Sequence, residues 1–210
     1  MILEMYDLFG DQELVAKIKT RLPKFFQLAE LENSRSGKVT MEVGTAREKI
    51  ISALLIYKFG EQNINTAIPA VESEIDVYAF GKPISIKTIT GLKYTGVKMI
   101  WTVDPAKARA FADAYYPKMC MLLARISWDR NGGLHYIPVE TQIEVFQGMG
   151  KERFIKLPKE GTNPRGVELT KEALSELVNH GQTLSISINW KKEELEFDPF
   201  GRWVDLWKME

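Results

Sequence analysis

An aspartate and a lysine lie on two neighbouring segments in which apolar and polar residues alternate. Residues 74–80 and 83–89 alternate with the period of a β-strand, and residues 81–82 (Gly-Lys) form a short link between them. Pairing these strands across a two-residue link places Asp76 opposite Lys87, with Cβ atoms ~4.5–5.5 Å apart on one face. A pairing shifted by two residues keeps both groups on that face. The sequence therefore predicts a carboxylate next to an ammonium group.

A cross-strand salt bridge is the plain structural interpretation of this pair, and such bridges contribute little when they are exposed. Three observations favour chemistry. The strands are rich in Ile, Val, Phe and Tyr, which places the pair near the core, and Glu74 adds a carboxylate close by. A helix expected from about residue 45 to 59 also carries Glu48 on the same face as Ile51 and Leu55. Glu48 then points toward the sheet, although a favourable interaction with the helix N-terminus would explain it as well.

Carboxylates and an ammonium in this arrangement suit phosphodiester hydrolysis. Two carboxylates can hold Mg²⁺, which polarises a phosphate and acidifies its bound water. An ammonium group within ~3 Å can orient or deprotonate the attacking water and stabilise developing negative charge.

The segment from about residue 45 to 90 resembles the core of the PD-(D/E)XK nuclease family. The resemblance rests on Asp76, the ten residues that follow it, and Ile86-Lys87 on the next strand, with Glu48 on the preceding helix. It implies that Asp76 is the central metal ligand and Lys87 the catalytic lysine. It further implies that the Ile86 main-chain carbonyl is a metal ligand and that Glu48 binds the metal directly or through water. Because Ser85 stands where the family has an acid, the second carboxylate falls to Glu48.

Within that family, the spacing of the three residues resembles the ThaI type II restriction endonucleases, which act on CGCG. That resemblance implies that Met41, seven residues before Glu48, wedges into the base stack from the minor groove. A core-filling role is the structural alternative for this methionine. The same resemblance implies attack by metal-activated water, blunt ends and a homodimer, because a twofold-symmetric target requires a twofold-symmetric reader.

Basic residues that could contact DNA are scattered along the chain, and solvated surface is the alternative for each. The 28 basic and 28 acidic side chains balance, which argues mildly against nucleic acid unless the charges are segregated. We single out six basic side chains as candidates for DNA contact: Arg35, Lys38, Arg47, Lys93, Arg125 and Arg130. Arginine reads guanine in the major groove, so Arg125 and Arg130 are candidates for base contacts.

The whole chain, residues 1–210, is expected to form one nuclease domain of the α/β (α+β) class, with a mixed central sheet flanked by helices. N-terminal helices are expected over residues 11–32 with a break at Pro23, a catalytic core over about 45–190, and an aromatic tail over 195–210. Further strands are expected over 118–127, 134–146 and 183–190, and helices over 105–115 and 170–179. No apolar run is long enough for a membrane span, and neither a secretory leader nor a disulfide framework is apparent, which favours the cytoplasm.

These features together predict a Mg²⁺-dependent site-specific endonuclease of a restriction system that binds and cuts duplex DNA at CGCG as a homodimer. A repair or recombination nuclease on the same core is the alternative within the class. A non-catalytic DNA-binding module, in which Asp76 and Lys87 form only a salt bridge, is the alternative outside it.

Overall fold

The computed structural model describes the chain except for residues 1, 36–37, 40–41, 70–73, 159–165 and 210. The helices described are α1 (Ile2–Gly10), α2 (Gln12–Glu32), α3 (Val43–Phe59), the short 3₁₀ turn η1 (Glu61–Asn63), α4 (Pro105–Ala114), α5 (Val139–Met149), α6 (Lys151–Phe154), α7 (Lys171–Asn179) and α8 (Gly201–Lys208). The strands described are β1 (Ser34–Arg35), β2 (Lys38–Val39), β3 (Ile64–Asn65), β4 (Val77–Ala79), β5 (Lys82–Thr90), β6 (Val97–Lys98), β7 (Cys120–Ile126), β8 (Asn131–Ile137), β9 (Ile155–Lys156), β10 (Glu168–Leu169) and β11 (Leu184–Asn189).

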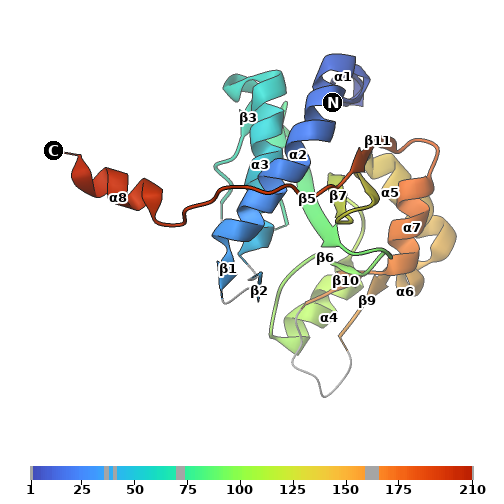
Figure 1. Ribbon diagram of the computed structural model, residues 1–210. Helices are drawn as coiled ribbons and strands as arrows, with labels where there is room; N and C mark the ends of the chain where they lie inside the picture. Colours follow the sequence, from blue (N-terminus) through green and yellow to red (C-terminus); the bar gives the residue numbers. More distant parts are fainter. Residues whose placement is uncertain (1, 36–37, 40–41, 70–73, 159–165, 210) are drawn as a thin grey trace.

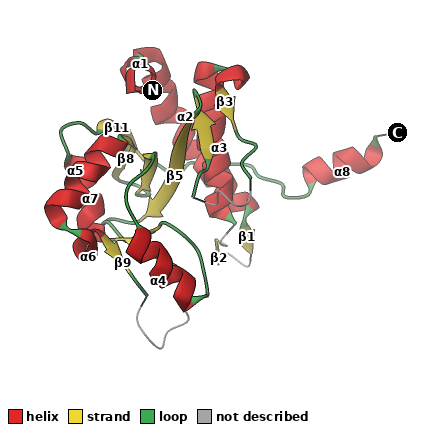
Figure 2. Cartoon of the chain, turned by 180° about the vertical axis from the view of Figure 1, so that it is seen from behind, coloured by secondary structure: helices red, strands yellow, loops and turns green. Residues whose placement is uncertain are grey.

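A mixed six-stranded sheet forms the centre of the molecule, in the order β11-β8-β7-β5-β4-β3. Strands β5 and β7 run parallel, and the other neighbouring pairs are antiparallel. Helices α2 and α3 lie on one side of the sheet, and α5 and α7 lie toward the other (Figures 1 and 2). The predicted fold class, a mixed sheet flanked by helices, is confirmed.

Each face of the sheet carries its own hydrophobic core. Leu122 and Ala124 of β7 belong to the cluster under α1, α2 and α3, whereas Met121 and Leu123 belong to the cluster under α4, α6 and α7. This alternation follows from the two-residue period of a strand. A strand buried on both faces reads as a continuous apolar run, as residues 119–124 do.

Helix boundaries follow local capping signals at several points. Asp11 accepts a hydrogen bond from the Leu14 amide and Thr170 accepts one from the Ala173 amide, as expected for N-caps. The predicted break at Pro23 is wrong, because α2 runs unbroken from Gln12 to Glu32. A helix-interior proline costs about 3 kcal/mol, and the buried face of α2, which includes Pro23 itself, offsets that cost.

The predicted strand over 134–146 is also only half right. Strand β8 ends at Ile137 and α5 begins at Val139, with Pro138 between them. The apolar residues of α5 mimic a strand pattern, but the buried Gln142 donates hydrogen bonds to the Met119 and Ile137 carbonyls and fixes the first turn of the helix.

The hairpin that joins β4 to β5 turns one residue earlier than predicted. Its loop is Phe80-Gly81, both with positive φ (52° and 72°), so that Ala79 pairs with Lys82. A two-residue loop with both residues at positive φ matches the twist of the flanking strands. The pairing is therefore shifted by two residues, and the predicted position of Lys87 directly opposite Asp76 is wrong.

Candidate active site

Strands β4 and β5 separate at Asp76. The ladder between them starts at Val77, which pairs with Ile84, whereas β5 continues to Thr90 alongside β7. The Asp76 amide still donates to the Ile84 carbonyl (3.1 Å). Beyond that point the Asp76 side chain, and not the β4 backbone, bonds to β5, because its Oδ2 accepts a hydrogen bond from the Ile86 amide at 2.6 Å. The carboxylate is thus held against the edge of β5 that β4 leaves unpaired.

Lys87 reaches the same carboxylate oxygen. Its Nζ lies 3.3 Å from Asp76 Oδ2, and the Ser85 hydroxyl lies at 3.3 Å from that atom. The Lys87 and Asp76 side chains are 13% and 19% exposed, so the pair is partly shielded but open to solvent. Because the side-chain period of a strand is two, the shift in register leaves both groups on one face, as the sequence predicted.

Helix α3 brings Glu48 to this pair. Ile51 and Leu55, on the same helical face, are fully buried against the sheet. Burial first and repulsion from Asp76 second raise the pKa of Glu48, Lys87 lowers it, and together they place it at about 7. A carboxylate with an elevated pKa beside a second carboxylate is a site where a cation would stabilise the charged form.

The three predicted side chains therefore come together at the point where β4 leaves β5. In an antiparallel ladder the amide and carbonyl of a hydrogen-bonded residue point to the same side. The Ile86 carbonyl accordingly faces the Asp76 side, where its amide is bound. Within the described ranges, no three His, Cys, Asp or Glu side chains are arranged to hold a metal ion. The protein ligands available are two carboxylates and one carbonyl, a set that suits Mg²⁺, which commonly keeps several waters and binds substrate phosphate.

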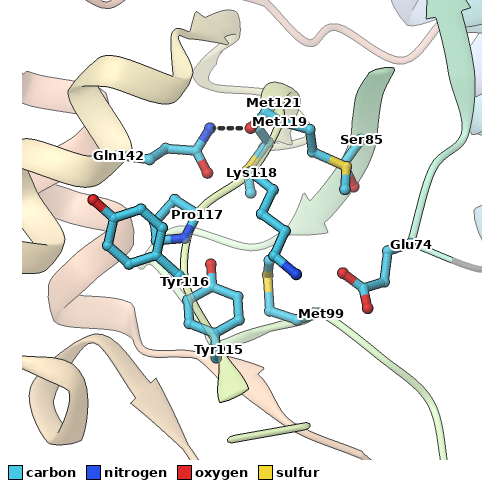
Figure 3. A pocket seen from close by; sticks show the side chains of 10 residues that line it. All are labelled: Glu74, Ser85, Met99, Tyr115, Tyr116, Pro117, Lys118, Met119, Met121 and Gln142. Carbon is cyan, nitrogen blue, oxygen red and sulfur yellow. Dashed lines mark hydrogen bonds between the residues drawn. The ribbon is translucent and has the colours of Figure 1, made fainter. Parts of the chain in front are cut away.

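A small pocket adjoins the site on the α5 side of the sheet. It measures about 20 Å³, enough for about one water, and Glu74, Ser85, Lys118 and Gln142 contribute to its lining. Figure 3 shows the Lys118 ammonium and the Glu74 carboxylate pointing toward one another. Burial raises the pKa of Glu74, whereas Lys118 and then Lys87 lower it. Lys118 was missed in the sequence because it lies at the start of an apolar run, thirty-one residues beyond Lys87.

Two of the basic residues selected from the sequence have partners within the protein, the buried Arg47 and the half-buried Arg125. Arg47 is 6% exposed; its guanidinium forms an ion pair with Glu30 and donates to Thr90 Oγ1. The Arg125 guanidinium lies over the Tyr94 ring, 5.1 Å from its centre. The structure favours a packing role for Arg47 over a phosphate contact.

Other candidates gather at the end of the sheet where β5 and β7 finish. The Gly91 amide bonds to the Ile126 carbonyl, so the loops with Lys93 and Arg130, both exposed, leave the sheet side by side. Arg35 on β1 and Lys38 on β2 are backbone partners in the hairpin shortly before α3. Met41 lies outside the described residues. The bond from Arg47 to Thr90 brings the start of α3 to this same end.

Comparison with known proteins identifies a family for this chain. The family model described as "Restriction endonuclease ThaI" matches residues 8–209. A solved structure described as "Restriction endonuclease in complex with substrate DNA" superposes with a TM-score of 0.91 at 55% sequence identity, covering 97% of this chain and 98% of that one. No curated protein sequence matches the chain. The family match spans nearly the whole length of a chain whose acid, lysine and helix glutamate already converge, and this protein therefore belongs to the ThaI restriction endonuclease family.

Proposed function

We propose that this protein is a homodimeric, Mg²⁺-dependent type II restriction endonuclease that cuts both strands of duplex DNA at CGCG and leaves blunt ends. The observation that carries the proposal is the convergence of Asp76, Lys87 and Glu48 where β4 and β5 separate. The family supports a restriction endonuclease, and enzymes of this kind typically use divalent metal ions. In the part of the chain that is described, no helix is both long and apolar enough to cross a membrane. We place the enzyme in the cytoplasm, where it would meet incoming DNA.

Asp76 and Glu48 fit the proposed ion chemically. Asp76 Oδ2 accepts hydrogen bonds from the Ile86 amide, the Ser85 hydroxyl and Lys87. We therefore expect the other carboxylate oxygen, Oδ1, to face the ion. Burial and the nearby Asp76 carboxylate raise the pKa of Glu48, so a bound cation would favour its charged form. When bound, Mg²⁺ supplies polarisation of the scissile phosphate and a more acidic water.

The chain's own groups would then arrange the reaction. The hydrogen bond from the Ile86 amide fixes the Asp76 carboxylate, which limits its motion relative to β5. Lys87 is held at the same point and can orient the attacking water and stabilise negative charge on the phosphate. Glu48, which comes from α3, supplies the second acid.

DNA would approach the end of the sheet that carries the loops after β5 and β7. Lys93 and Arg130 are exposed there, and the Arg35–Lys38 hairpin adjoins the start of α3. We propose that these residues and Arg125 contact DNA, and that Met41 inserts between base pairs. A CG step is a pyrimidine–purine step, the class that unstacks most easily.

Digestion of a plasmid that contains CGCG sites tests the proposal. With Mg²⁺ we expect discrete fragments whose sequenced ends are blunt and lie within CGCG, and none from a plasmid whose sites are changed to CGTG. The Asp76→Ala and Lys87→Ala variants should each lose cleavage and retain their circular dichroism spectrum. Exposed Glu176→Gln, on α7, is the matched control. Fragments that map elsewhere, or full activity in either variant, would overturn the proposal.

A further inference from the structure

The last helix of the chain is amphipathic and stands away from the body of the molecule. Figures 1 and 2 both show α8 beyond α3 and β1, joined to the rest by an extended segment. Its apolar side chains share one face, and they are exposed: Trp203 56%, Val204 45%, Leu206 49% and Trp207 89%. Exposed aromatic side chains concentrated on one helical face mark an interaction surface.

The same chain carries an apolar groove. A hollow of about 460 Å³ lies between α2 and α3 on the outer surface of these helices. Residues from both helices contribute to its lining, among them Leu14, Ile18, Phe25, Ile50, Leu54 and Tyr57. Phe25 and Tyr57 are 41% and 64% exposed, so the groove presents large rings to solvent.

The segment that leads to α8 and the α2 side of the groove carry opposite charges. Residues 194–209, which we call the C-terminal arm, have three acids before α8, and α8 itself carries Arg202, Asp205 and Lys208. The three acids are Glu194, Glu196 and Asp198, and the bases of α2 that line the groove are Arg21 and Lys17, which pairs with Glu13. Attraction between this acidic segment and the bases of α2 favours the approach of the arm to the groove.

The start of the arm is fixed to the body. Gln27 of α2 accepts from the Glu193 amide at 3.0 Å and donates to the Glu193 carbonyl at 2.7 Å. The seven residues 194–200 that follow can extend about 23 Å at ~3.3 Å per residue. The Phe200 amide donates to Asp198 Oδ1 at 2.8 Å and so opens α8 at the end of this reach.

From this arrangement we propose that two copies exchange their arms, so that α8 of each copy lies in the α2–α3 groove of the other. This inference rests on the proposed homodimer and identifies its interface. Reciprocal exchange fills two identical grooves with two identical helices under one twofold axis. The three exposed aromatic side chains of each arm, Phe200, Trp203 and Trp207, at roughly 200 Å² each, together with the groove surface and the second arm, would bury about 2,000 Å², the area of a stable dimer.

Disulfide trapping between copies tests the exchange. One copy carries Val204→Cys on the apolar face of α8, and the other carries Ala53→Cys in the groove. Mixed and oxidised, they should form a covalent dimer at twice the chain mass. Asp205→Cys, on the polar face of α8, is the matched control and should trap at least tenfold less. The natural Cys120 is buried and remains in place.

A chain that carries both Val204→Cys and Ala53→Cys shows whether the groove is filled by the chain's own arm or by the arm of the other copy. A disulfide within one chain, with no trapping between mixed copies, would show that the arm covers its own groove and would overturn the proposal. Equal trapping by Asp205→Cys, or trapping in neither format, would also overturn it.

The dissociation constant of the dimer, measured by sedimentation, tests whether the exchanged arms stabilise it. Trp203→Ala with Trp207→Ala should weaken dimerisation at least a hundredfold, since buried tryptophans dominate interfaces. Trp101→Ala, at an exposed tryptophan outside the arm, should leave it unchanged. A dimer that persists in the double variant without trapping refutes arm exchange but keeps the proposed homodimer, whereas a wild-type monomer at all concentrations refutes both.

Discussion

Replacing Glu48 by glutamine should make the metal-free protein more stable at alkaline pH. Burial first, and repulsion from Asp76 second, raise the pKa of this carboxyl from 4.5 to about 7. A group whose pKa is raised on folding contributes stability below its unfolded pKa, and that contribution is lost as the pH rises through the folded value. Above pH 7 the native protein therefore holds an unfavourable half-buried charge, which glutamine removes while it keeps the shape of the protonated acid.

The size of the effect follows from the shift. At ~1.4 kcal/mol per pKa unit, a change from 4.5 to about 7 corresponds to about 3 kcal/mol at pH 8. At pH 5.5 the native carboxyl is already mostly protonated, and the gain falls to about 1 kcal/mol. For a chain of this length, about 3 kcal/mol corresponds to a rise in Tm of about 6–12 °C.

Thermal and urea unfolding in EDTA at both pH values measure the difference, with Glu176→Gln as an exposed control. Adding Mg²⁺ at pH 8 should stabilise the wild type and reverse the order, because the glutamine variant lacks one anionic ligand. A Glu48→Gln variant no more stable than the wild type at pH 8, or equally stabilised at both pH values, would refute the electrostatic reasoning.

Three further substitutions test other parts of the structure. Arg47→Met should destabilise the fold by about 3–5 kcal/mol in urea unfolding, because the buried Glu30 loses its Arg47 partner and keeps the Trp128 indole and the more distant Lys192; intact stability with weaker DNA binding would instead make Arg47 a phosphate contact. Lys87→Ala should slow single-turnover cleavage by at least about a hundredfold while fluorescence anisotropy shows unchanged DNA affinity in Ca²⁺, and a parallel loss of affinity would contradict its catalytic role. Met41→Ala should lower the affinity or the sequence selectivity for CGCG duplexes and leave the rate of the chemical step unchanged, whereas unaltered affinity and selectivity would favour the core-filling alternative for Met41.

The grouping of Asp76 with Lys87 was accessible from the sequence even though the predicted turn was wrong. An error of two residues in register leaves every side chain on its own face. Asp76 and Lys87 therefore share a face whether the hairpin loop is Gly81-Lys82, as predicted, or Phe80-Gly81, as observed. The position of the turn was not accessible, because it requires the non-glycine residue Phe80 to adopt a positive φ. Packing of the Phe80 ring against Phe59, with ring centres 5.2 Å apart, is a tertiary contact that no local pattern reports.

Glu48 could be placed toward the sheet because Ile51 and Leu55 mark the buried face of its helix. Arg47, one residue earlier, shows the limit of that reasoning. An arginine in a basic stretch resembles a phosphate contact, and only its distant partners, Glu30 on α2 and Thr90 on β5, reveal that it is buried. The groove between α2 and α3 was equally hidden, since it depends on how two helices pack rather than on either sequence alone.

The most direct test of the central claim is a crystal structure with a CGCG duplex and Mn²⁺, in which anomalous scattering locates the ion. We predict an ion about 2.0–2.3 Å from oxygens of Asp76 and the Ile86 carbonyl, with Glu48 bound directly or through one water and Lys87 beside the scissile phosphate. An ion held elsewhere, for example by Glu74 with Asp76 bare, would contradict the account.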